Sequence, residues 1–390
     1  MKVLYFLHYS ELYGANRSFL NLIDGLGDKV QKMAIIPDSG AIENELNKRR
    51  VAYFILPFEW STYERTWLSE VKRPLRILRR LTNILRVAHL VKNYEPDILH
   101  SNSSVITVGM FTSLYLNIPH VWHIREFGLD DYNLHYDFGE SGKRWLINKS
   151  DHIINISESI SEYVRGKESN QTTIYNGIFD KNEIAEFSDC EEPISNFGIV
   201  GYILPNKGQE EAIRAFSQTI NSIPDAHLFI IGTGRQDYIE YLQKLAEKLN
   251  VSDRVTFTGF IVNQEEIYKK IHVLLVCSKK EGMGRVIPEA MIRGIPIIGR
   301  KVGAIPELIE HKFTGFLYST TQELAENMIA LHKSRKLYRS IRQKAFLYAN
   351  QTFLIEGYAN SVFQVYQKIL YKRRKNAVSN LLIDCKTENT

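Results

Sequence analysis

Two carboxylates in the second half of the chain have a type and spacing that suit a polyhydroxylated ligand. Glu281 and Glu289 lie in the segment EGMGRVIPE, with two glycines between them. The pattern predicts a strand that ends near Ser278, then a loop, then a helix that begins near Arg285. Glycines let the backbone approach a ligand closely, and the amides of a helix N-terminus favour a bound anion. Because carboxylates accept hydrogen bonds from hydroxyls, the pair suits a molecule with sugar rings at both ends of a phosphate.

The same residues also have ordinary structural explanations. A loop acid is commonly solvated, and an acid in the first turn of a helix is favoured by the helix dipole. Lys207 can be a solvated residue beside a helix start, and His123 a half-buried histidine at a strand end. The surroundings favour a ligand site, because glycine-containing segments recur at predicted strand ends. These are YNGI at 175–178, GYILPNKG at 201–208, IIGTG at 230–234 and FTGF at 257–260.

Short apolar segments alternate with helical patterns along the chain and must position these residues. The alternation predicts an α/β fold with two Rossmann-like, doubly wound parallel-sheet domains that face each other across a cleft. We expect strands at KVLYFL, KMAIIP, AYFILP, DILHSN, HVWHI, HIINIS and TTIYN, and then at FGIVGYI, HLFIIG, VTFTGF, VLLVCS and IPIIGR. The expected domains cover residues 1–179 and 195–352, with an acid-rich linker over 180–194, a helix over 353–375 and a tail over 376–390.

The ordered segments resemble the signature of retaining GT-B glycosyltransferases, in particular those of family 4. The match rests on the spacing of Glu281 and Glu289, followed by AM, GIPII and GAIPELI, together with the four glycine-containing segments. The resemblance implies a GT-B fold and a retaining enzyme that moves a sugar from a nucleotide diphosphate to an acceptor hydroxyl. It implies a UDP-sugar or GDP-sugar donor, no further cofactor and no metal ion. It also implies a C-terminal helix that crosses back onto the first domain.

The resemblance further implies roles for individual residues of the second domain, which would bind the nucleotide sugar. Glu281 would contact hydroxyls of the transferred sugar, Glu289 the ribose and Lys207 the diphosphate. A cation at the diphosphate stabilises the charge that grows as the glycosidic bond breaks. The remaining donor-binding residues expected in this domain are Gly232, Gly234, Phe260, Ile261, Gly282, Met283, Gly284, Arg285 and Val286.

Two residues of the first, acceptor-side domain enter the expected site through the same resemblance. His123, in VWHIREFG, would lie near the anomeric carbon and form the catalytic set with Glu281 and Lys207. Gly14, in YGANRS, would approach the donor phosphates, at a position where the family usually has two glycines. Asn102, in DILHSNSS, is expected at another strand end, where open α/β sheets present ligand-binding residues.

One position departs from the family pattern. An Arg usually follows the first glycine of the GYILPNKG segment, and here the residue is Tyr202. Loss of a cation at a developing anion costs about 3 kcal/mol, or roughly a hundredfold in rate, unless another cation compensates. Arg285 and Arg17 are candidates for that compensation. The alternative function is a non-catalytic GT-B partner subunit of a glycan-assembly complex.

A basic segment supplies the second functional signal. The chain has 49 Lys and Arg against 44 Asp and Glu, a net charge of +5, yet residues 65–92 alone hold eight bases and one acid. Leucines recur there at helical spacing, so the segment is either a surface helix packed on the sheet or an interfacial helix on anionic lipid. Three widely spaced cysteines favour a cytoplasmic protein, and the second reading adds peripheral contact at the inner face of the plasma membrane. Its acceptor would be a glycan, lipid-linked or part of a growing cell-surface polysaccharide.

Several other classes are not favoured. No apolar run reaches the roughly 18 residues of a membrane-spanning helix, and the mild charge gives no reason to expect nucleic acid as a partner. Cys190, Cys277 and Cys385 lie far apart and match no zinc or disulfide spacing. The first expected strand is not followed by GxGxxG, which argues against a dinucleotide-dependent oxidoreductase. The pair Asp130 and Asp131 is interpreted as part of a polar loop rather than a metal site.

Overall fold

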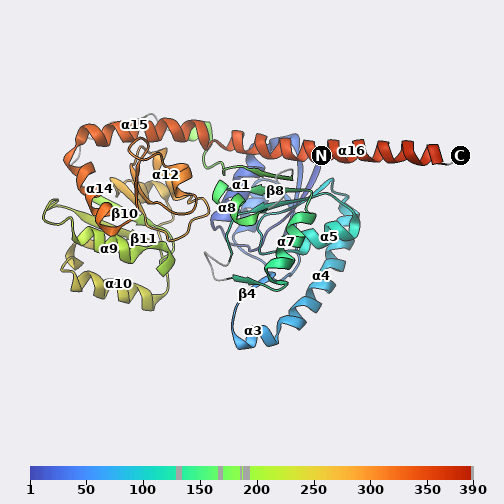
Figure 1. The fold of residues 1–390 in the computed structure, drawn as a ribbon, viewed down its shortest axis with the longest axis horizontal. Coiled ribbons are helices and arrows are strands. Elements are labelled where there is room, and N and C mark those ends of the chain that lie inside the picture. Colours follow the sequence, from blue (N-terminus) through green and yellow to red (C-terminus); the bar gives the residue numbers. More distant parts are fainter. Residues whose placement is uncertain (129–133, 166–169, 185–186, 188–193, 388–390) are drawn as a thin grey trace. The chain divides into compact units, whose positions relative to one another are not determined.

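The computed structural model describes residues 1–128, 134–165, 170–184, 187 and 194–387 (Figure 1). The chain divides into two compact units. Residues 1–177 and 355–390 form the first unit, and residues 178–354 form the second. Each unit contains one parallel sheet with helices beside it.

The first unit is built on a seven-stranded parallel sheet in the order β3-β2-β1-β5-β6-β8-β9. Its strands are β1 (Lys2–Phe6), β2 (Gln31–Ile36), β3 (Ala52–Ile55), β5 (Ile98–Ser101), β6 (His120–Ile124), β8 (His152–Asn155) and β9 (Gln171–Thr173). The helices between them include α1 (Gly14–Leu26), α2 (Ile42–Lys48), α4 (Arg73–Tyr94), α5 (Val108–Leu116), α7 (Gly139–Lys149) and α8 (Glu158–Val164). The strand order reverses between β1 and β5, which makes the carboxyl ends of these strands the place where such sheets bind ligands.

The central strand β1 shows how the sequence builds this core. Its side chains alternate between the two faces of the sheet. Val3 and Tyr5 pack with α1 and the C-terminal helix α16 (Ile355–Thr387), whereas Leu4 and Phe6 pack with α4. All four residues are fully buried. The strand is therefore a continuous apolar run because helices cover both faces.

Helix α16 belongs to the first unit although it follows the second in sequence (Figure 1). It packs on α1 and buries Tyr358, Val362 and Tyr366. The two helices come close at Gly25, where an added Cβ would lie 2.6 Å from Cβ of Ala359. The helix continues to Thr387 through the residues for which the sequence predicts a tail.

The second unit is built on a six-stranded parallel sheet in the order β12-β11-β10-β13-β14-β15. Its strands are β10 (Asn196–Val200), β11 (His227–Ile231), β12 (Val255–Gly259), β13 (Val273–Val276), β14 (Ile297–Arg300) and β15 (Phe316–Tyr318). Its helices are α9 (Gln209–Ser217), α10 (Gln236–Lys248), α11 (Gln264–Tyr268), α12 (Val286–Met291), α13 (Ile305–Leu308), α14 (Thr321–Lys333) and α15 (Arg335–Thr352). The order reverses between β10 and β13. The two parallel sheets confirm the predicted fold class.

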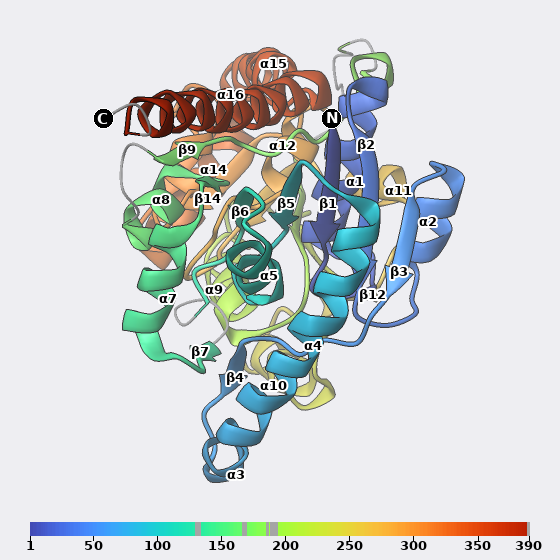
Figure 2. The same cartoon turned by 90° about the vertical axis from the view of Figure 1, so that its right-hand side faces the viewer.

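A small antiparallel sheet in the first unit is missed by the sequence reasoning. Strands β4 (Thr62–Glu64) and β7 (Leu134–Tyr136) pair with each other and precede α3 (Trp67–Val71) and α7 respectively (Figure 2). Each has three residues, which is too short to show a period-two pattern. Strand β15, of the same length, is missed for the same reason. Within the described part of the chain, we find no helix with the length and apolarity needed to span a bilayer.

Five histidines buried in the first unit should make its stability pH-dependent, and for one of them, His152, burial lowers the pKa to about 4. Burial lowers the pKa of His8 and His120 to about 3 and holds those of His100 and His123 well below the ordinary value. Their contribution is fully present above the unfolded pKa near 6.5 and is lost as pH falls towards the folded values. We expect each histidine to cost about 1.4 kcal/mol of unfolding free energy per pH unit below 6.5.

Urea unfolding followed by circular dichroism between pH 7.5 and 5 measures this slope. His120→Asn should reduce the slope, because His120 is held between the hydroxyls of Ser101 and Ser150 with no solvent contact. His89→Asn, at an exposed position of α4, is the matched control. A stability that does not change with pH over this interval would contradict the prediction.

Candidate active site

The predicted donor-site residues of the second unit lie in loops that follow the carboxyl ends of its strands. Residues 201–208 follow β10, residues 232–235 follow β11, residues 260–263 follow β12 and residues 277–285 follow β13. Because β10 and β13 are neighbours at the reversal of strand order, their loops meet at the switch point of the sheet. Parallel strands end at one edge, so residues distant in sequence come together there.

Lys207 and Glu281 form an ion pair at this switch point. Nζ of Lys207 lies 2.8 Å from Oε2 of Glu281, and Oγ of Ser278 donates a hydrogen bond to the same oxygen at 2.9 Å. The two side chains are 27% and 16% exposed, so both remain within reach of solvent. A phosphate could attract the ammonium and a hydroxyl could donate to the carboxylate, which are the two contacts a nucleotide sugar offers.

Close backbone packing fixes the loops that carry this pair. Gly208 has φ +76°, and a Cβ there would lie 2.1 Å from the carbonyl oxygen of Cys277. Gly303 has φ +54°, and a Cβ there would lie 2.5 Å from the carbonyl oxygen of Glu281. The amide of Ala304 donates to that carbonyl at 2.9 Å. The positions of Lys207 and Glu281 are therefore set by glycines next to them in space.

Glu289 lies in the first turn of α12, as the sequence predicts, and is largely buried. The hydroxyl of Tyr268 donates to its Oε2 at 3.0 Å, and Nε of Arg285 lies 3.6 Å from its Oε1. Burial and the adjacent carboxylate raise the pKa of Tyr268 well above its ordinary value, so its proton stays in this hydrogen bond. Arg285, which the sequence offers as a replacement phosphate cation, lies beside Glu289.

The other predicted donor-site residues lie in two loops and differ in how far they are exposed. In the loop between Glu281 and α12, Gly282 and Met283 are buried, whereas Gly284, Arg285 and Val286 are partly exposed. Gly284 turns that loop with φ +71°. After β12, Phe260 is 66% exposed and Ile261 is half-buried. An exposed aromatic ring at the sheet edge offers a surface on which a planar ring of a ligand can stack.

Gly232 and Gly234 let two loops touch backbone to backbone. A Cβ on Gly232, where φ is +141°, would lie 1.9 Å from the carbonyl oxygen of Gly201. A Cβ on Gly234 would lie 2.2 Å from the carbonyl oxygen of Ile203, whose amide donates to the carbonyl of Thr233 at 2.7 Å. The loop after β10 is thereby held against the loop after β11.

The sequence reasoning missed Arg235, which follows these glycines directly. Its side chain is 72% exposed and pairs with Asp237, which is itself 64% exposed. The loop bearing Arg235 is bridged to the loop bearing Tyr202 through Gly234 and Ile203. The sequence feature that could have identified Arg235 is a basic residue immediately after IIGTG.

The first unit places His123 and a second missed residue, Arg125, at the carboxyl end of β6. His123 is fully buried and Arg125 is largely buried. The guanidinium of Arg125 donates to Oδ1 of Asn102 at 3.0 and 2.8 Å and to Oδ1 of Asn176 at 2.6 Å. It also lies 3.3 Å from Nδ1 of His123 and 3.2 Å from the hydroxyl of Tyr358. Its partners among the described residues are all neutral.

This contact fixes the tautomer of His123. A guanidinium has no acceptor, so Nδ1 of His123 accepts from Arg125 and the ring proton sits on Nε2. That Nε2 has no hydrogen-bond partner among the residues that the structure describes. Burial and the charge of Arg125 hold the pKa of His123 well below its usual range. His123 is therefore a neutral ring with its Nε2–H buried inside the first unit.

Gly14, the other predicted residue of the first unit, is the first residue of α1. The loop before it is held by Asn16, whose Nδ2 donates to the carbonyls of Tyr9 and Glu11 at 2.9 and 2.8 Å. Nε of Arg17 donates to the carbonyl of Leu12 at 3.1 Å. Arg17, the second candidate for the missing phosphate cation, thus braces this loop.

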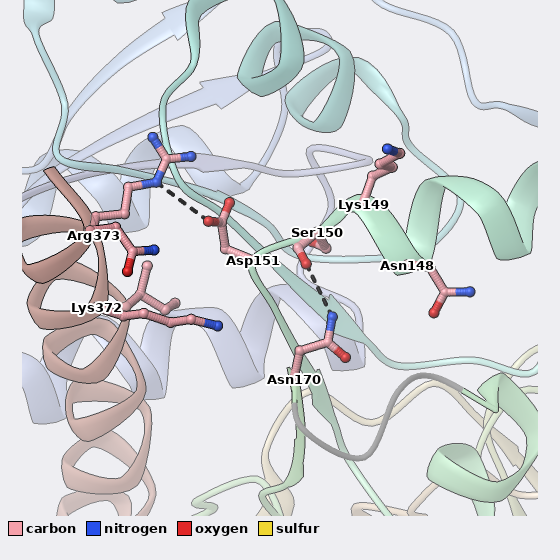
Figure 3. Close-up of a pocket in the computed structure, with 9 residues that line it drawn as sticks. Asn148, Lys149, Ser150, Asp151, Asn170, Lys372 and Arg373 are labelled. Atoms are coloured by element: carbon pink, nitrogen blue, oxygen red, sulfur yellow. Dashed lines mark hydrogen bonds and ion pairs between the residues drawn. The ribbon is translucent and has the colours of Figure 1, made fainter. Parts of the chain in front are cut away.

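No cluster of three or more His, Cys, Asp or Glu suited to a metal ion occurs in the described ranges, and Asp130 and Asp131 lie outside the described residues. A cavity of about 380 Å³ opens in the first unit (Figure 3). Ser150 and Asn170, which line it, precede β8 and β9. The cavity therefore lies at the amino edge of the sheet, away from the edge where such sheets bind ligands.

Comparisons with known proteins match both units. The Glycosyltransferase Family 4 model matches residues 14–180, and the Glycosyl transferases group 1 model matches residues 181–347. The N-acetyl-alpha-D-glucosaminyl L-malate synthase of Bacillus anthracis is 30% identical over 246 residues, 58% of this chain and 62% of that enzyme. The chain thus spans less than two thirds of that relative. The lipopolysaccharide core biosynthesis mannosyltransferase LpsB of Rhizobium meliloti is 22% identical over 242 residues, 58% of this chain and 68% of the relative.

A solved structure shows the same fold. Anabaena HepE in complex with UDP and glucose superimposes with a TM-score of 0.76 at 21% sequence identity. The match covers 94% of this chain and 100% of the other. The two proteins therefore share a fold with two parallel-sheet units over almost the whole length of this chain.

The contact between Gly232 and Gly201 gives a test of the candidate site. Gly232→Ala should destabilise the second unit by about 3 kcal/mol, because the new Cβ overlaps a carbonyl oxygen and φ is positive. Gly357→Ala is the control, since nothing lies within 4 Å of its added Cβ and alanine favours the helix by up to about 1 kcal/mol. Urea denaturation measures both changes. Equal stabilities for the two variants would contradict the assigned backbone contact.

Proposed function

The chain belongs to the GT-B glycosyltransferases of group 1 and family 4, and we propose that it moves a sugar from a nucleotide diphosphate sugar to an acceptor hydroxyl with retention of configuration. The observation that carries this proposal is the Lys207–Glu281 pair at the switch point of the second sheet. The donor binds to the second unit and the acceptor to the first. The oxidoreductase alternative has no such support.

In the proposed reaction each charged group meets the part of the donor that it suits. Lys207 leaves Glu281 and binds the diphosphate, while the freed carboxylate accepts from hydroxyls of the sugar. The bond between the anomeric carbon and the diphosphate oxygen breaks, and the diphosphate takes the electron pair. The acceptor oxygen bonds to the same face of that carbon, and a phosphate oxygen of the leaving group takes its proton. Lys207 then stabilises the charge that grows on the leaving group.

The donor base, we propose, lies against the exposed ring of Phe260, and the ribose hydroxyls reach Glu289. UDP in the complex of the similarly folded HepE supports a uridine diphosphate sugar as donor, and a guanosine diphosphate sugar is the alternative. The mannosyltransferase LpsB acts in lipopolysaccharide core biosynthesis, which supports a lipid-linked or growing surface glycan as acceptor. Lys207 and Arg235 supply positive charge at the diphosphate, and we propose that no metal ion takes part.

The alternative function is that of a non-catalytic partner subunit, which Tyr202 favours. This side chain is 52% exposed at a position where the family pattern has an arginine. Arg235 counts against this alternative, because the adjacent loop offers a cation in its place. A measurable turnover by the chain alone therefore separates the two functions.

Lys207→Ala should lower turnover about a hundredfold, because it removes the cation from the leaving diphosphate. A panel of UDP- and GDP-sugars is first screened by thermal shift, and release of the nucleoside diphosphate is then measured at saturating donor. Lys279→Ala is the matched control, since this exposed lysine lies in the loop of Glu281 and carries the same charge. An unchanged rate for Lys207→Ala would remove Lys207 from the site.

Arg235→Ala should lower turnover about tenfold if Arg235 replaces the missing arginine, a smaller loss than for Lys207 because the side chain is more exposed. The same release assay measures it. Lys248→Ala, at the far end of α10, serves as the charge control.

Addition of EDTA should leave the wild-type rate unchanged. A wild-type rate of zero with every donor that binds would favour the partner-subunit alternative.

A further inference from the structure

The helices α3 and α4 expose an unusual apolar surface at the end of the first unit. Trp67 is 78% exposed, and four other side chains are exposed to a similar degree. We call this surface the α3–α4 apolar patch; it comprises Trp67, Leu68, Val71, Leu75 and Leu78. Figures 1 and 2 show α3 at the end of α4 that lies beyond the β4–β7 sheet. Single exposed apolar side chains are common, whereas a contiguous group marks an interaction surface.

The patch is not the face that packs on the protein core. Ile84, Val87 and Val91, in the second half of α4, are buried in the core cluster that includes Leu4 and Phe6 of β1. At helical spacing these three positions lie on the side of α4 opposite Leu75 and Leu78. The helix thus carries two apolar faces, one covered by its own sheet and one exposed. An ordinary surface helix needs only the first.

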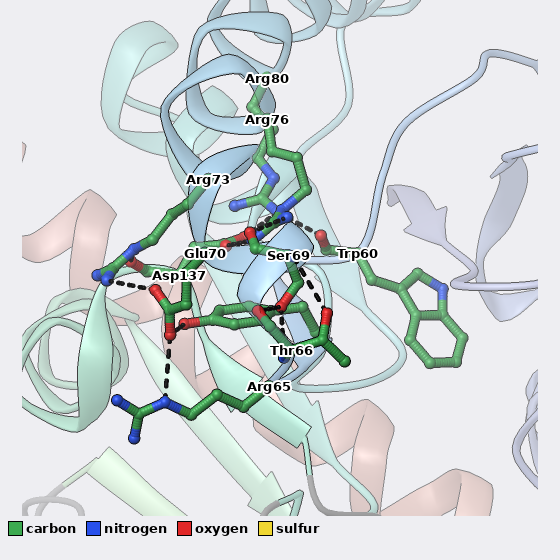
Figure 4. Close-up of polar contacts among 10 residues, drawn as sticks. Trp60, Arg65, Thr66, Ser69, Glu70, Arg73, Arg76, Arg80 and Asp137 are labelled. Atoms are coloured by element: carbon green, nitrogen blue, oxygen red, sulfur yellow. Dashed lines mark hydrogen bonds and ion pairs between the residues drawn. The ribbon is translucent and has the colours of Figure 1, made fainter.

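A buried ion-pair cluster holds the patch in place (Figure 4). The carboxylate of Asp137 is fully buried and pairs with Arg80 and, at 2.8 Å, with Arg76. Nε of Arg73 donates to the carbonyl of Asp137 at 2.7 Å. Arg76 also donates to the carbonyl of Ser69 at 2.7 Å, which ties α3 to α4. Three arginines on one side of α4 are therefore used internally, and the opposite side is directed outwards.

The bases that remain at the surface border the patch. Lys72 and Arg86 are exposed, and Arg79 is 72% exposed beside Glu59, with a separation of 3.5 Å. Exposed pairs of this kind contribute little and are easily exchanged for another anion. Leucines and a tryptophan rimmed by Lys and Arg have the composition of a segment that lies in the headgroup region of an anionic bilayer.

We propose that the α3–α4 apolar patch inserts into the surface of an anionic lipid bilayer while Lys72, Arg79 and Arg86 contact the headgroups. The inference rests on the proposed function in one respect: membrane binding would bring the chain to a lipid-linked acceptor. The membrane is favoured over a protein partner by the combination of a small apolar patch with cations around it. A second copy of the chain is the competing occupant and is separated by the test.

The experiment measures co-sedimentation of the full chain with vesicles of equal parts phosphatidylglycerol and phosphatidylcholine, and with phosphatidylcholine alone. The wild type should bind the anionic vesicles at least tenfold more tightly. Trp67→Ser with Leu68→Ser and Leu75→Ser should lose that binding. Leu114→Ser with Tyr115→Ser, which removes exposed apolar side chains from α5 instead, should keep it. Lys72→Glu with Arg79→Glu and Arg86→Glu should lose the preference for anionic lipid.

Three results would overturn the proposal. These are no binding by the wild type, equal binding by the patch variant, or a wild-type dimer in light scattering that the patch variant converts to monomer. UDP binding by calorimetry and the melting temperature show whether each variant keeps its fold. Vesicle binding does not depend on turnover, so a chain that binds vesicles but transfers no sugar contradicts the proposed function alone. A chain that transfers sugar to a water-soluble acceptor but ignores vesicles contradicts this inference alone.

Discussion

Parallel β-strands end at one edge of a sheet, and every residue of the candidate site depends on this constraint. Lys207 and Glu281 are 74 positions apart in sequence, yet they form an ion pair because β10 and β13 are adjacent and point the same way. The constraint also explains the glycines. Several loops leave the same edge and must pass one another, so Gly208, Gly232 and Gly303 occur where a side chain would strike a neighbouring backbone.

The sequence could predict those parts of the site in which the functional residue follows a strand within the same short segment. A strand followed by a glycine and a polar residue is visible without any partner, so the segments around Lys207, Gly232 and Glu281 can be recognised in the sequence, and the family resemblance implies their roles. Arg125 was not recognised in this way, because its importance comes from Asn102, Asn176 and Tyr358, which belong to three other parts of the chain. The short strands β4 and β7 were missed for a related reason, since three residues carry no period and only the pairing defines them.

A count of the charges in the basic segment, residues 65–92, does not show which of them pair with residues that are distant in sequence. Residues 65–92 hold eight bases in the sequence, but the acid that pairs with Arg76 and Arg80 is Asp137, which lies in the turn between β7 and α7 and is fully buried. A buried carboxylate of this kind needs its partners, because an uncompensated buried charge is costly. The arginines therefore serve first to fix α4, and the leucines expected to pack on the sheet divide between the core and the surface. Pattern alone shows that a helix has an apolar face but not which of two faces the protein covers.

The tautomer of His123 bears on where the acceptor proton goes. Arg125 can only donate, so Nδ1 of His123 is occupied as an acceptor and Nε2 already carries the proton. A ring in that state can donate to a hydroxyl or to a leaving oxygen, but it has no free lone pair with which to take a proton. Its depressed pKa opposes formation of the cation as well. A general-base role for His123 is thus disfavoured by its tautomer and by its lowered pKa. If the chain transfers sugars as we propose, the proton of the acceptor hydroxyl must leave by another group, and the oxygen of the departing diphosphate is the base that the reaction itself supplies.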